Sequence, residues 1–457
     1  MNFSQGRECS QGSSAGKGTD VHCPGTRRVS RQWLSECREE RALTQDLMEE
    51  IADPLNLVAA QRQVVKNGGS AGIDGMSTKE LRNWFSRSYK MLSQSLKTGT
   101  YQPEAVREVQ IPKPKGGYRK LGIPTVKDRL VQQAISQVLT LRYEPVFSNH
   151  SYGFRPGRNA QQGLQTAGRY VKEGYNYVID LDLEKFFDEV NHDRLIWLLG
   201  TRIGDKRVLK LIGKFLRSGI LKDGLTSQRI KGTPQGSPLS PLLSNIVLDE
   251  LDKELEKRGH RFVRYADDAI ILLQSEASAR RVKENITAFI ENRLRLKVNR
   301  EKSRICRPWE LNFLGHSILP DGHLGLSRES EEKFKTKIRE LTRRNRGISL
   351  EQLIKELNPV LRGWLNYFRL ARMRKRLEKL EGWIKRRIRC FRLKQCKRAI
   401  GIVRFLKYLG VVEWRAWLLA LSSKGWYHKS CTPQANEGMN NRWFASMGLY
   451  SLMKNYG

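Results

Sequence analysis

The sequence has no long hydrophobic run and few cysteines, and both absences exclude classes of protein. A membrane-spanning helix needs about 20 consecutive apolar residues, so we expect no membrane partner. The 7 cysteines are scattered, without a C-x-x-C pair or a histidine at ligand spacing, which argues against a disulfide framework or a structural zinc site. A reducing interior, the cytoplasm of a bacterial-type cell, is therefore the expected location.

Acidic residues are also few compared with basic ones. The chain has 47 Asp and Glu against 83 Lys and Arg, which gives a net charge of +36. An excess of this size is the electrostatic signature of a protein that binds a polyanion. The 10 Trp, 14 Tyr and 15 Phe add rings on which bases can stack, which favours nucleic acid over a membrane surface. We therefore expect a protein that associates with the nucleoid through RNA or DNA.

Residues 1–41 are expected to form a disordered basic arm. Residues 1–31 are rich in Ser, Gly and Arg but lack the apolar segment of a secretory signal. Glu8 and Asp20 argue against an organellar transit peptide.

The adjacent carboxylates Asp267 and Asp268 lie in the middle of the stretch Arg261–Leu273. Apolar and β-forming residues on both sides predict a strand, a tight turn and a second strand, with the two carboxylates at the tip. Neighbouring negative charges repel each other unless a cation lies between them, and Mg²⁺ accepts carboxylate and phosphate oxygens together. On Tyr265–Asp268 alone, an ordinary Asp-Asp turn is an equally good interpretation.

A second acidic stretch precedes it in the chain. Val178–Leu183 alternates apolar and acidic residues, so Asp180 and Asp182 should share one face of a strand. Two carboxylates on one face of a buried strand need a cation or a base nearby; the alternative is an edge strand with a wet face. Downstream, Asp193 is expected to cap a helix that ends at Gly200.

Two further stretches have the residues to receive a nucleotide. Arg107–Pro124 predicts a hairpin with glycine at its turn, whose basic side chains could hold a triphosphate. Gly232–Pro241 is rich in glycine and proline, and its glycines would let the backbone approach a base pair closely. A solvated hairpin, and a rigid connector before a helix capped by Ser240, fit these patterns equally well. Arg155 and Arg158 could contact phosphate or could be surface charge.

From Glu331 onward the sequence is helical and basic. Ser349 is predicted to cap a helix that breaks at Pro359, and a further helix follows with one apolar face from Met373 to Phe391. Between Arg372 and Arg398 there are 13 Lys and Arg against two Glu. This excess predicts a helix that lies on phosphate. Residues 401–457 fit either a small second nucleic-acid module or a packing cap.

Together these stretches predict a chemistry. Three acidic positions on two strands, a basic hairpin and a glycine loop fit phosphoryl transfer with two metal ions. Glycoside hydrolysis would leave the positive charge unexplained, and a two-metal nuclease would leave the triphosphate-holding hairpin unexplained.

In their order along the chain, these stretches resemble the reverse transcriptase/maturase proteins encoded by group II introns. The resemblance runs from about Ser70 to Lys397 and includes these blocks: Ser70–Gly75, Ile111–Pro124, Ser151–Arg158, Asp182–Asp188, Thr233–Ser240, Tyr265–Asp268, Leu311–Gly315 and the thumb-like Leu361–Phe368. It implies an α+β fold of the right-hand polymerase type, with an antiparallel sheet in the palm. The implied domains are fingers with an N-terminal extension over 42–175, a palm over 176–325, a helical thumb or maturase domain X over 326–400, and a DNA-binding-like region over 401–457.

Matched residue by residue, the resemblance makes Asp182, Asp267 and Asp268 the catalytic carboxylates that hold two Mg²⁺ ions. The backbone carbonyl of Leu183 would complete the metal site. Asp182 is preferred over Asp180 because the family has an aromatic residue five positions later, where this chain has Phe187.

Other matched residues would bind the substrates. Lys113 and Arg119 would hold the triphosphate, Phe187 would exclude a ribose 2′-hydroxyl and so favour dNTPs, and Gln235 and Gly236 would lie beneath the nascent pair. Lys302 matches a lysine that protonates pyrophosphate. The residues expected to bind RNA lie on the basic helix: Arg372, Arg374, Lys375, Arg376, Lys385 and Arg386.

The implied function is an RNA-directed DNA polymerase that also binds its intron RNA to assist splicing and mobility. Its partners would be intron RNA, an RNA template with a DNA primer, target DNA and dNTPs. A reverse transcriptase of host defence or DNA repair is disfavoured by the maturase-like thumb, and a splicing factor without polymerase activity by the intact acidic residues. Many relatives carry a C-terminal HNH endonuclease with paired cysteines. This sequence does not, so we expect mobility to use priming from a nascent replication strand.

Overall fold

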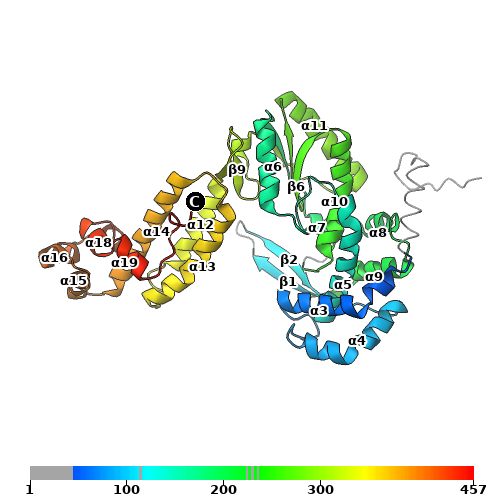
Figure 1. The fold of residues 1–457 in the computed structure, drawn as a ribbon, viewed down its shortest axis with the longest axis horizontal. Coiled ribbons are helices and arrows are strands. Elements are labelled where there is room, and N and C mark those ends of the chain that lie inside the picture. Colours follow the sequence, from blue (N-terminus) through cyan, green and yellow to red (C-terminus); the bar gives the residue numbers. More distant parts are fainter. Residues whose placement is uncertain (1–44, 113–115, 223–224, 228–230, 234–235, 457) are drawn as a thin grey trace, which may run out of the picture.

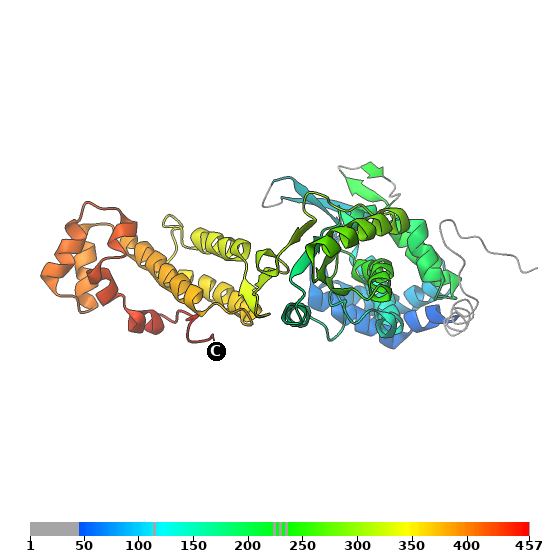
Figure 2. The same ribbon diagram turned by 90° about the horizontal axis from the view of Figure 1, so that it is seen from above.

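The computed structural model describes residues 45–112, 116–222, 225–227, 231–233 and 236–456. Two parts are visible in Figure 1 and Figure 2: a body of helices and sheets, formed by residues 45–327, and an elongated helical arm, formed by residues 328–456. The mixture of helices and sheets confirms the predicted α+β class. The predicted N-terminal arm 1–41, Lys113 and Gln235 lie outside the described residues.

Helices make up most of the body. Two of them begin as their sequences predict: the Asp53 carboxylate accepts from Leu55 N (2.8 Å) ahead of Pro54, and the Thr125 hydroxyl accepts from Asp128 N (3.2 Å). Their apolar faces form the main core, in which Leu130 is fully buried. The body helices are α2 (Leu47–Ile51), α3 (Pro54–Asn67), α4 (Leu81–Lys97), α5 (Val126–Tyr143), α6 (Ala160–Lys172), α7 (Phe186–Glu189), α8 (His192–Gly200), α9 (Lys206–Arg217), α10 (Ser240–Lys257) and α11 (Glu276–Phe289), with short turns η1 (Glu144–Val146), η2 (Ile290–Leu294) and η3 (Pro308–Glu310).

One sheet of the body contains the predicted basic hairpin. Its strand order is β2-β1-β4-β5. Strands β1 (Val106–Pro112) and β2 (Tyr118–Ile123) pair antiparallel from Arg107 opposite Ile123 to Pro112 opposite Tyr118. Strand β4 (Ile220–Lys222) runs parallel to β1 and antiparallel to β5 (Leu225–Ser227). The two strands confirm the predicted hairpin, which extends outward from the body in Figure 2.

The central sheet has the order β6-β7-β3-β8 and helices on both faces. Its strands are β3 (Tyr177–Leu181), β6 (Arg261–Tyr265), β7 (Asp268–Leu273) and β8 (Arg304–Cys306). Alternate residues such as Ile179 and Ile271 enter the main core beside α10 and α11. Their neighbours Val178 and Ile270 enter a smaller core with α6 on the opposite face. Because β3 lies between β7 and β8, it is not the edge strand that one interpretation of its acidic residues required.

The arm continues from a small two-stranded sheet of β9 (His316–Ile318) and β10 (Leu324–Leu326). Its long helix α14 buries the predicted apolar face, including Leu377, Ile384 and Phe391, and Phe334 stacks on Trp364 with ring centroids 4.2 Å apart. The arm helices are α12 (Arg328–Leu341), α13 (Leu350–Phe368), α14 (Arg374–Gln395), α15 (Ala399–Tyr408), α16 (Glu413–Leu421), α17 (Trp426–Lys429), α18 (Pro433–Gly438) and α19 (Asn441–Ser446). Within the described residues no helix is both long and apolar enough to cross a bilayer.

Several local predictions were wrong. Asn191, not Asp193, caps α8: its side-chain oxygen accepts from Arg194 N at 2.9 Å. Ser240 is the first residue of α10 rather than its cap, because the Ser237 hydroxyl, one turn earlier, accepts from Leu239 N at 3.2 Å.

Two regular elements also differ from prediction. Pro359 lies inside an unbroken α13. The sequence of Leu296–Ser303 also predicts a short strand, but the segment forms only the bridge Leu183–Val298 and a turn ahead of β8.

Candidate active site

The two acidic segments meet at one edge of the central sheet. Strands β3 and β7 pair Leu181 with Ala269, and the same register carried one residue further places Asp182 across from Asp268. Directly opposed residues of antiparallel strands have Cβ atoms about 4.5–5.5 Å apart. Asp267 lies in the tight turn that the pair Tyr265–Asp268 closes. The three predicted carboxylates are therefore neighbours, on the loop ends of strands far apart in the sequence.

The surrounding charges raise the affinity of Asp268 for protons. Desolvation and the charges of Asp267, Asp182 and Asp180 together raise its pKa to about 6, and Lys302 opposes the rise. Burial also raises the pKa of Asp180. Among the described side chains, Lys302 Nζ lies 3.3 Å from Asp182 Oδ2 and Arg304 Nε lies 3.9 Å from Asp180 Oδ2. Negative charge gathered in this way favours a divalent cation.

The donor set fits magnesium that is held jointly with a substrate. Among the described residues, no three His, Cys, Asp or Glu side chains are grouped closely enough to form a metal site by themselves. Mg²⁺ does not require such a cage, because it commonly binds one or two carboxylates and completes its octahedron with water and substrate phosphate oxygens. Asp182 and Asp268, across from each other on adjacent strands, supply that kind of partial ligand set.

A turn after η2 fixes the end of β3. Asn299 N donates to the Asp182 carbonyl (2.9 Å), and the Ser303 hydroxyl accepts from Asp182 N (3.0 Å) and donates to the same carbonyl (3.2 Å). Leu183, predicted to offer its carbonyl to a metal, forms an isolated bridge with Val298 and is 7% exposed. The backbone that carries Asp182 is therefore anchored on both sides of the side chain.

A cavity of about 540 Å³ opens beside the carboxylates. The cavity is lined by residues from three separate segments: Asp267 from the turn between β6 and β7, Phe187 from α7, and Gly236 from the loop Gly232–Pro241. A Cβ at Gly236, whose φ is +115°, would lie 3.1 Å from the Gly122 carbonyl oxygen, so this loop touches the end of β2. The other lining residues are Val64, Asn67, Gly68, Leu121, Arg129, Gln133, Phe154, Ser237, Pro238, Ser240 and Pro241.

Two lining residues were not predicted from the sequence. Arg129 donates to the Ser70 carbonyl (2.6 Å), which holds the segment after α3 against α5. Phe154 has a left-handed backbone (φ +58°) and is 54% exposed. The strained, exposed aromatic follows a glycine in the loop before α6, but nothing in the sequence pattern distinguishes it from a core residue.

The remaining predicted nucleotide contacts are less well defined by the structure. Arg119 lies in β2 opposite Ile111, and its side chain is outside the described part. Arg155 is neither a phosphate contact nor surface charge: its side chain is 2% exposed and bonds to Glu144 at 2.8 Å. Arg158 is half-buried and donates to both the carbonyl and the side-chain oxygen of Asn149.

The predicted RNA-binding residues divide into exposed and internally bonded ones. Arg374 and Lys375 are exposed at the start of α14. Arg372 pairs with Asp321 (2.7 Å) and Arg376 donates to the Leu326 carbonyl (2.8 Å), although both remain exposed.

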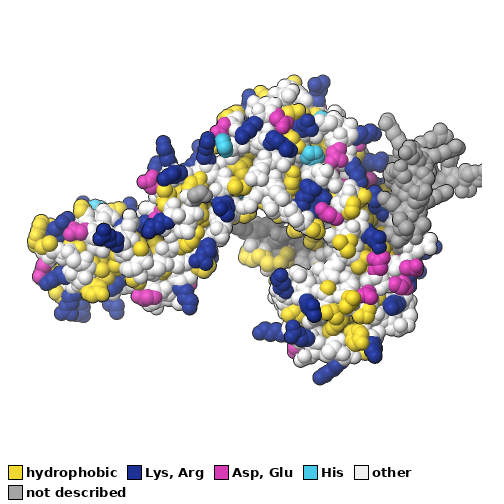
Figure 3. Space-filling model, viewed as in Figure 1, with side chains coloured by type: hydrophobic (Ala, Val, Ile, Leu, Met, Phe, Trp, Pro, Cys, Tyr) yellow, Lys and Arg dark blue, Asp and Glu magenta, His cyan; other side chains and the backbone are white. Residues whose placement is uncertain are grey.

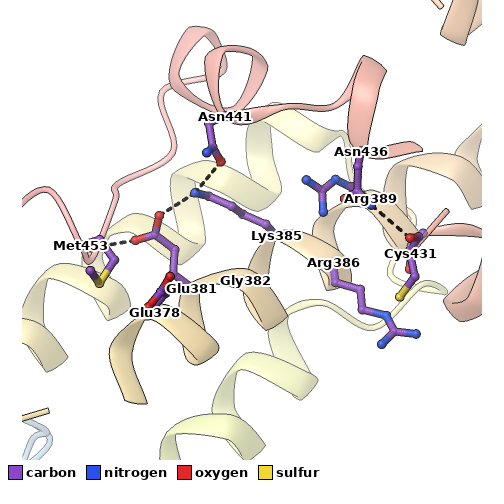
Figure 4. Close-up of a pocket in the computed structure, with 11 residues that line it drawn as sticks. Glu378, Glu381, Gly382, Lys385, Arg386, Arg389, Cys431, Asn436, Asn441 and Met453 are labelled. Atoms are coloured by element: carbon purple, nitrogen blue, oxygen red, sulfur yellow. Dashed lines mark hydrogen bonds and ion pairs between the residues drawn. The ribbon is translucent and has the colours of Figure 1, made fainter. Parts of the chain in front are cut away.

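Lys385 and Arg386 line a second cavity of about 580 Å³, between α14 and the C-terminal helices. In Figure 4, Lys385 reaches toward Glu381 (2.5 Å) and Asn441 (2.9 Å), whereas Arg386 points away from them. Arg386 lies over the Tyr427 ring, 3.7 Å from its centroid. Lys385 thus connects α14 to α19. The sequence predicted an RNA contact for this residue and not this structural role.

Comparison with known proteins identifies the family. Residues 111–318 match the reverse transcriptase (RNA-dependent DNA polymerase) family, and residues 331–408 match the group II intron maturase-specific domain. Protein YkfC of Escherichia coli (strain K12) is 30% identical over 358 residues, which cover 68% of this chain and 91% of that protein. The chain belongs to the group II intron reverse transcriptase/maturase family. This confirms the predicted family and its enzyme class, RNA-directed DNA polymerase.

Other similarities to this reverse transcriptase/maturase are more partial. The group II intron-encoded protein LtrA of Lactococcus lactis subsp. cremoris is 33% identical over 295 residues, 50% of this chain and 49% of that protein. The chain thus spans about half of LtrA's length. Among solved structures, a chain of a "Partial Cas6-RT-Cas1--Cas2 complex" is 28% identical and covers 54% of this chain and 42% of that one, with a TM-score of 0.35.

Proposed function

We propose that this reverse transcriptase copies RNA into DNA at Asp182, Asp267 and Asp268, and that its helical arm binds intron RNA to assist splicing and mobility. The observation that carries the catalytic part is the β3–β7 register, which brings Asp182 across from Asp268 beside a cavity lined by Phe187 and Gly236. The LtrA similarity supports the intron RNA, the RNA template with its DNA primer, and the target DNA as partners.

The side chains around the cavity have distinct tasks in nucleotide transfer. Two magnesium ions, when bound, neutralise the phosphates and lower the pKa of the primer hydroxyl. Phe187, beside Asp267, blocks the space that a ribose 2′-hydroxyl would need, so dNTPs are preferred. The open backbone at Gly236 lets a base pair lie against the loop. Lys302, whose ammonium lies beside Asp182, is placed to give a proton to the departing pyrophosphate.

The two-part shape supports a division into polymerase domains. Fingers over 42–175 carry the β1–β2 hairpin, and a palm over 176–325 carries the central sheet. A thumb or maturase domain over 326–400 forms the first part of the arm, and a DNA-binding-like region over 401–457 forms its end. Basic side chains are scattered over the visible face of body and arm in Figure 3, which also shows a hollow between the arm and the part of the body that carries α3 and α4. A nucleic-acid duplex fits a hollow bordered by positive charge.

Primer extension on an RNA template tests the catalytic assignment. Asp267→Asn keeps the size of the side chain but removes a charge from the metal-binding group, so extension should fall to background while RNA affinity stays at the wild-type level. Replacing Mg²⁺ by Ca²⁺, which tolerates a looser geometry, should likewise stop extension in the wild type without releasing RNA.

Asp193→Asn is the matched control, because Asp193 is an exposed carboxylate in the first turn of α8, in the same body. Normal extension by Asp267→Asn would reject the assignment. Splicing assays on the Asp267→Asn variant separate the two activities. If both roles exist, the variant should lose extension and splice normally. A wild type that assists splicing but does not extend primers would show that splicing is its only role.

A further inference from the structure

A buried ion pair lies directly beneath the turn that carries Asp267. Arg264, the fourth residue of β6, is 1% exposed, and Asp252 of α10 is 0% exposed. Arg264 Nε lies 2.7 Å from Asp252 Oδ1, and Nη2 lies 2.5 Å from Oδ2. Taking two charges out of water is costly, and the cost is offset only when the remaining donors also find partners.

The remaining donors of Arg264 are directed at the turn itself. Its Nη1 donates to the Ala266 carbonyl and to Asn245 Oδ1, both at 2.9 Å. Asn245 Nδ2 in turn donates to the Gly153 carbonyl at 2.9 Å. One guanidinium therefore joins α10, the loop before α6 and the backbone residue immediately before Asp267.

The turn needs support of this kind because its conformation is strained. Ala266 has φ +58°, a left-handed conformation that costs roughly 1–2 kcal/mol for a residue with a Cβ. The opposite side of the turn is in contact with Gly153, where an added Cβ would lie 2.2 Å from Ala266 N. The Ala266 peptide is thus held from the loop side by Gly153 and from the core side by Arg264.

We propose that Arg264, Asp252 and Asn245 are positioning residues for nucleotide transfer, which hold the Ala266 peptide so that Asp267 and Asp268 face Asp182. This inference rests on the proposed function of those three carboxylates. The contacts described above reach the turn through its backbone, at the Ala266 carbonyl and at the Ala266 N that faces Gly153. The network requires a planar guanidinium, which donates hydrogen bonds to Asp252 and to the turn at the same time. A lysine ammonium cannot reproduce this arrangement.

Arg264→Lys tests the proposal, because it keeps a positive charge beside Asp252 but loses the fork. At saturating dNTP we expect the extension rate to fall about 10–100-fold, the usual effect of losing a group that orients a metal ligand. The KM for dNTP and the primer–template affinity should stay within about twofold, since the cavity lining is unchanged. Mn²⁺ binding to the protein alone, followed by electron paramagnetic resonance, should weaken about tenfold at the site that Asp267→Asn abolishes.

Asp205→Asn is the control for lost stability. Asp205 is also buried, with its side chain 2% exposed, but it caps α9 and accepts from Met48 N, away from the turn. Rates and Mn²⁺ affinities are compared per folded molecule. If Arg264→Lys fails to fold, Asn245→Ala, which leaves no buried charge unpaired, should lower the rate about threefold to tenfold.

The possible outcomes separate this inference from the proposed function. The inference is overturned if Arg264→Lys has the same extension rate and the same Mn²⁺ affinity as Asp205→Asn. If Arg264→Lys does not fold, Asn245→Ala is compared with Asp205→Asn instead. A wild type that does not extend primers but binds Mn²⁺ more tightly than Arg264→Lys would refute the polymerase and support the positioning network. A wild type that neither extends primers nor shows Asp267-dependent Mn²⁺ binding would overturn both.

Discussion

Phe187 is the side chain whose place in the cavity predicts substrate choice. It packs edge-on to Phe186, with ring centroids 5.3 Å apart, and lines the cavity together with Asp267. Phe187→Ala removes the ring that would meet a 2′-hydroxyl, so the preference for dNTP over rNTP should fall by roughly 10–100-fold. Single-nucleotide incorporation with each substrate measures the ratio of the two kcat/KM values.

Phe186→Leu is the comparison for that measurement, because Phe186 is 2% exposed and belongs to the core rather than the cavity. It should leave the dNTP/rNTP ratio unchanged even if it lowers stability. An unchanged ratio in Phe187→Ala would mean that its ring only packs, which is the ordinary interpretation of an aromatic at this position.

At the level of single residues, motifs predicted which acidic positions lie together but not the contacts beneath them. The structure brings Asp182, Asp267 and Asp268 to neighbouring strand ends, and their catalytic role stays a prediction. Arg264 was not identified, since its partner Asp252 lies on α10 and the pairing depends on how that helix packs under β6. Lys385 was assigned to RNA by its charge alone, although its spacing of four residues from Glu381 was a usable signal for an internal pair.

The N-terminus of α5 contains a buried carboxylate that should make stability depend on pH. Asp128 accepts from the Tyr101 hydroxyl (2.8 Å) and the Thr125 hydroxyl (2.9 Å). Burial nevertheless raises its pKa from 3.8 to about 6, and these hydrogen bonds oppose the rise only in part. The folded state therefore binds a proton more tightly than the unfolded chain does, and this contribution to stability is present below pH 3.8 and lost as the pH rises through 6.

Asp128→Asn removes that titration. We expect the wild type to lose stability relative to the variant between pH 5 and pH 7.5, by about 1–3 kcal/mol given the size of the shift. The measurement is the difference in Tm between the two proteins at both pH values, and the exposed Asp193→Asn should show no such change. If the Tm difference between wild type and Asp128→Asn is the same at both pH values, the pKa of Asp128 is not raised.

Whole elements were predictable where a pattern covered several residues. The hairpin around Gly116 and Gly117, the two acidic strands and the apolar face of α14 all follow from periodicity and turn residues. Pro359 shows where a local rule fails: an interior proline costs about 3 kcal/mol. The helix continues through it because Leu353, Leu357, Leu361 and Leu365 are all buried, each worth about 1.5–3 kcal/mol. Only the packed arm provides that compensation, so the sequence around Pro359 predicted a break.

The molecule as a whole has a positive charge that is unevenly available to RNA. Some basic side chains of α14 are used internally, as Lys385 is, while Arg374 and Lys375 are exposed at its start. Truncating both to alanine should weaken RNA binding and lower the slope of log affinity against log salt by about 1–2, because up to two phosphate contacts are lost. Filter binding of a structured RNA between 50 and 200 mM salt, a span over which such contacts respond strongly, measures the slope.

Lys385→Ala removes one positive charge without removing an exposed phosphate contact. Its expected effect is on stability, about 1–3 kcal/mol from a buried Glu381 carboxylate that keeps its hydrogen bonds from Ser451 and Met453 N but loses its cation, with the salt slope unchanged. If Lys385→Ala lowers the slope and the Arg374/Lys375 pair does not, RNA lies over the second cavity rather than over the start of α14.

The antiparallel pairing of β3 with β7 limits which insertions and deletions this enzyme can tolerate within β3. Side chains alternate between the two faces of the sheet, so deleting one residue between Tyr177 and Leu181 would turn the remaining part of the strand over. After a deletion of Val178, for example, Ile179 and Leu181 would face the α6 side, and Asp180 and Asp182 would enter the main core. Insertions and deletions in these five residues should therefore be far more damaging than most substitutions there, because the proposed catalysis needs Asp182 on the same face of the sheet as Asp268.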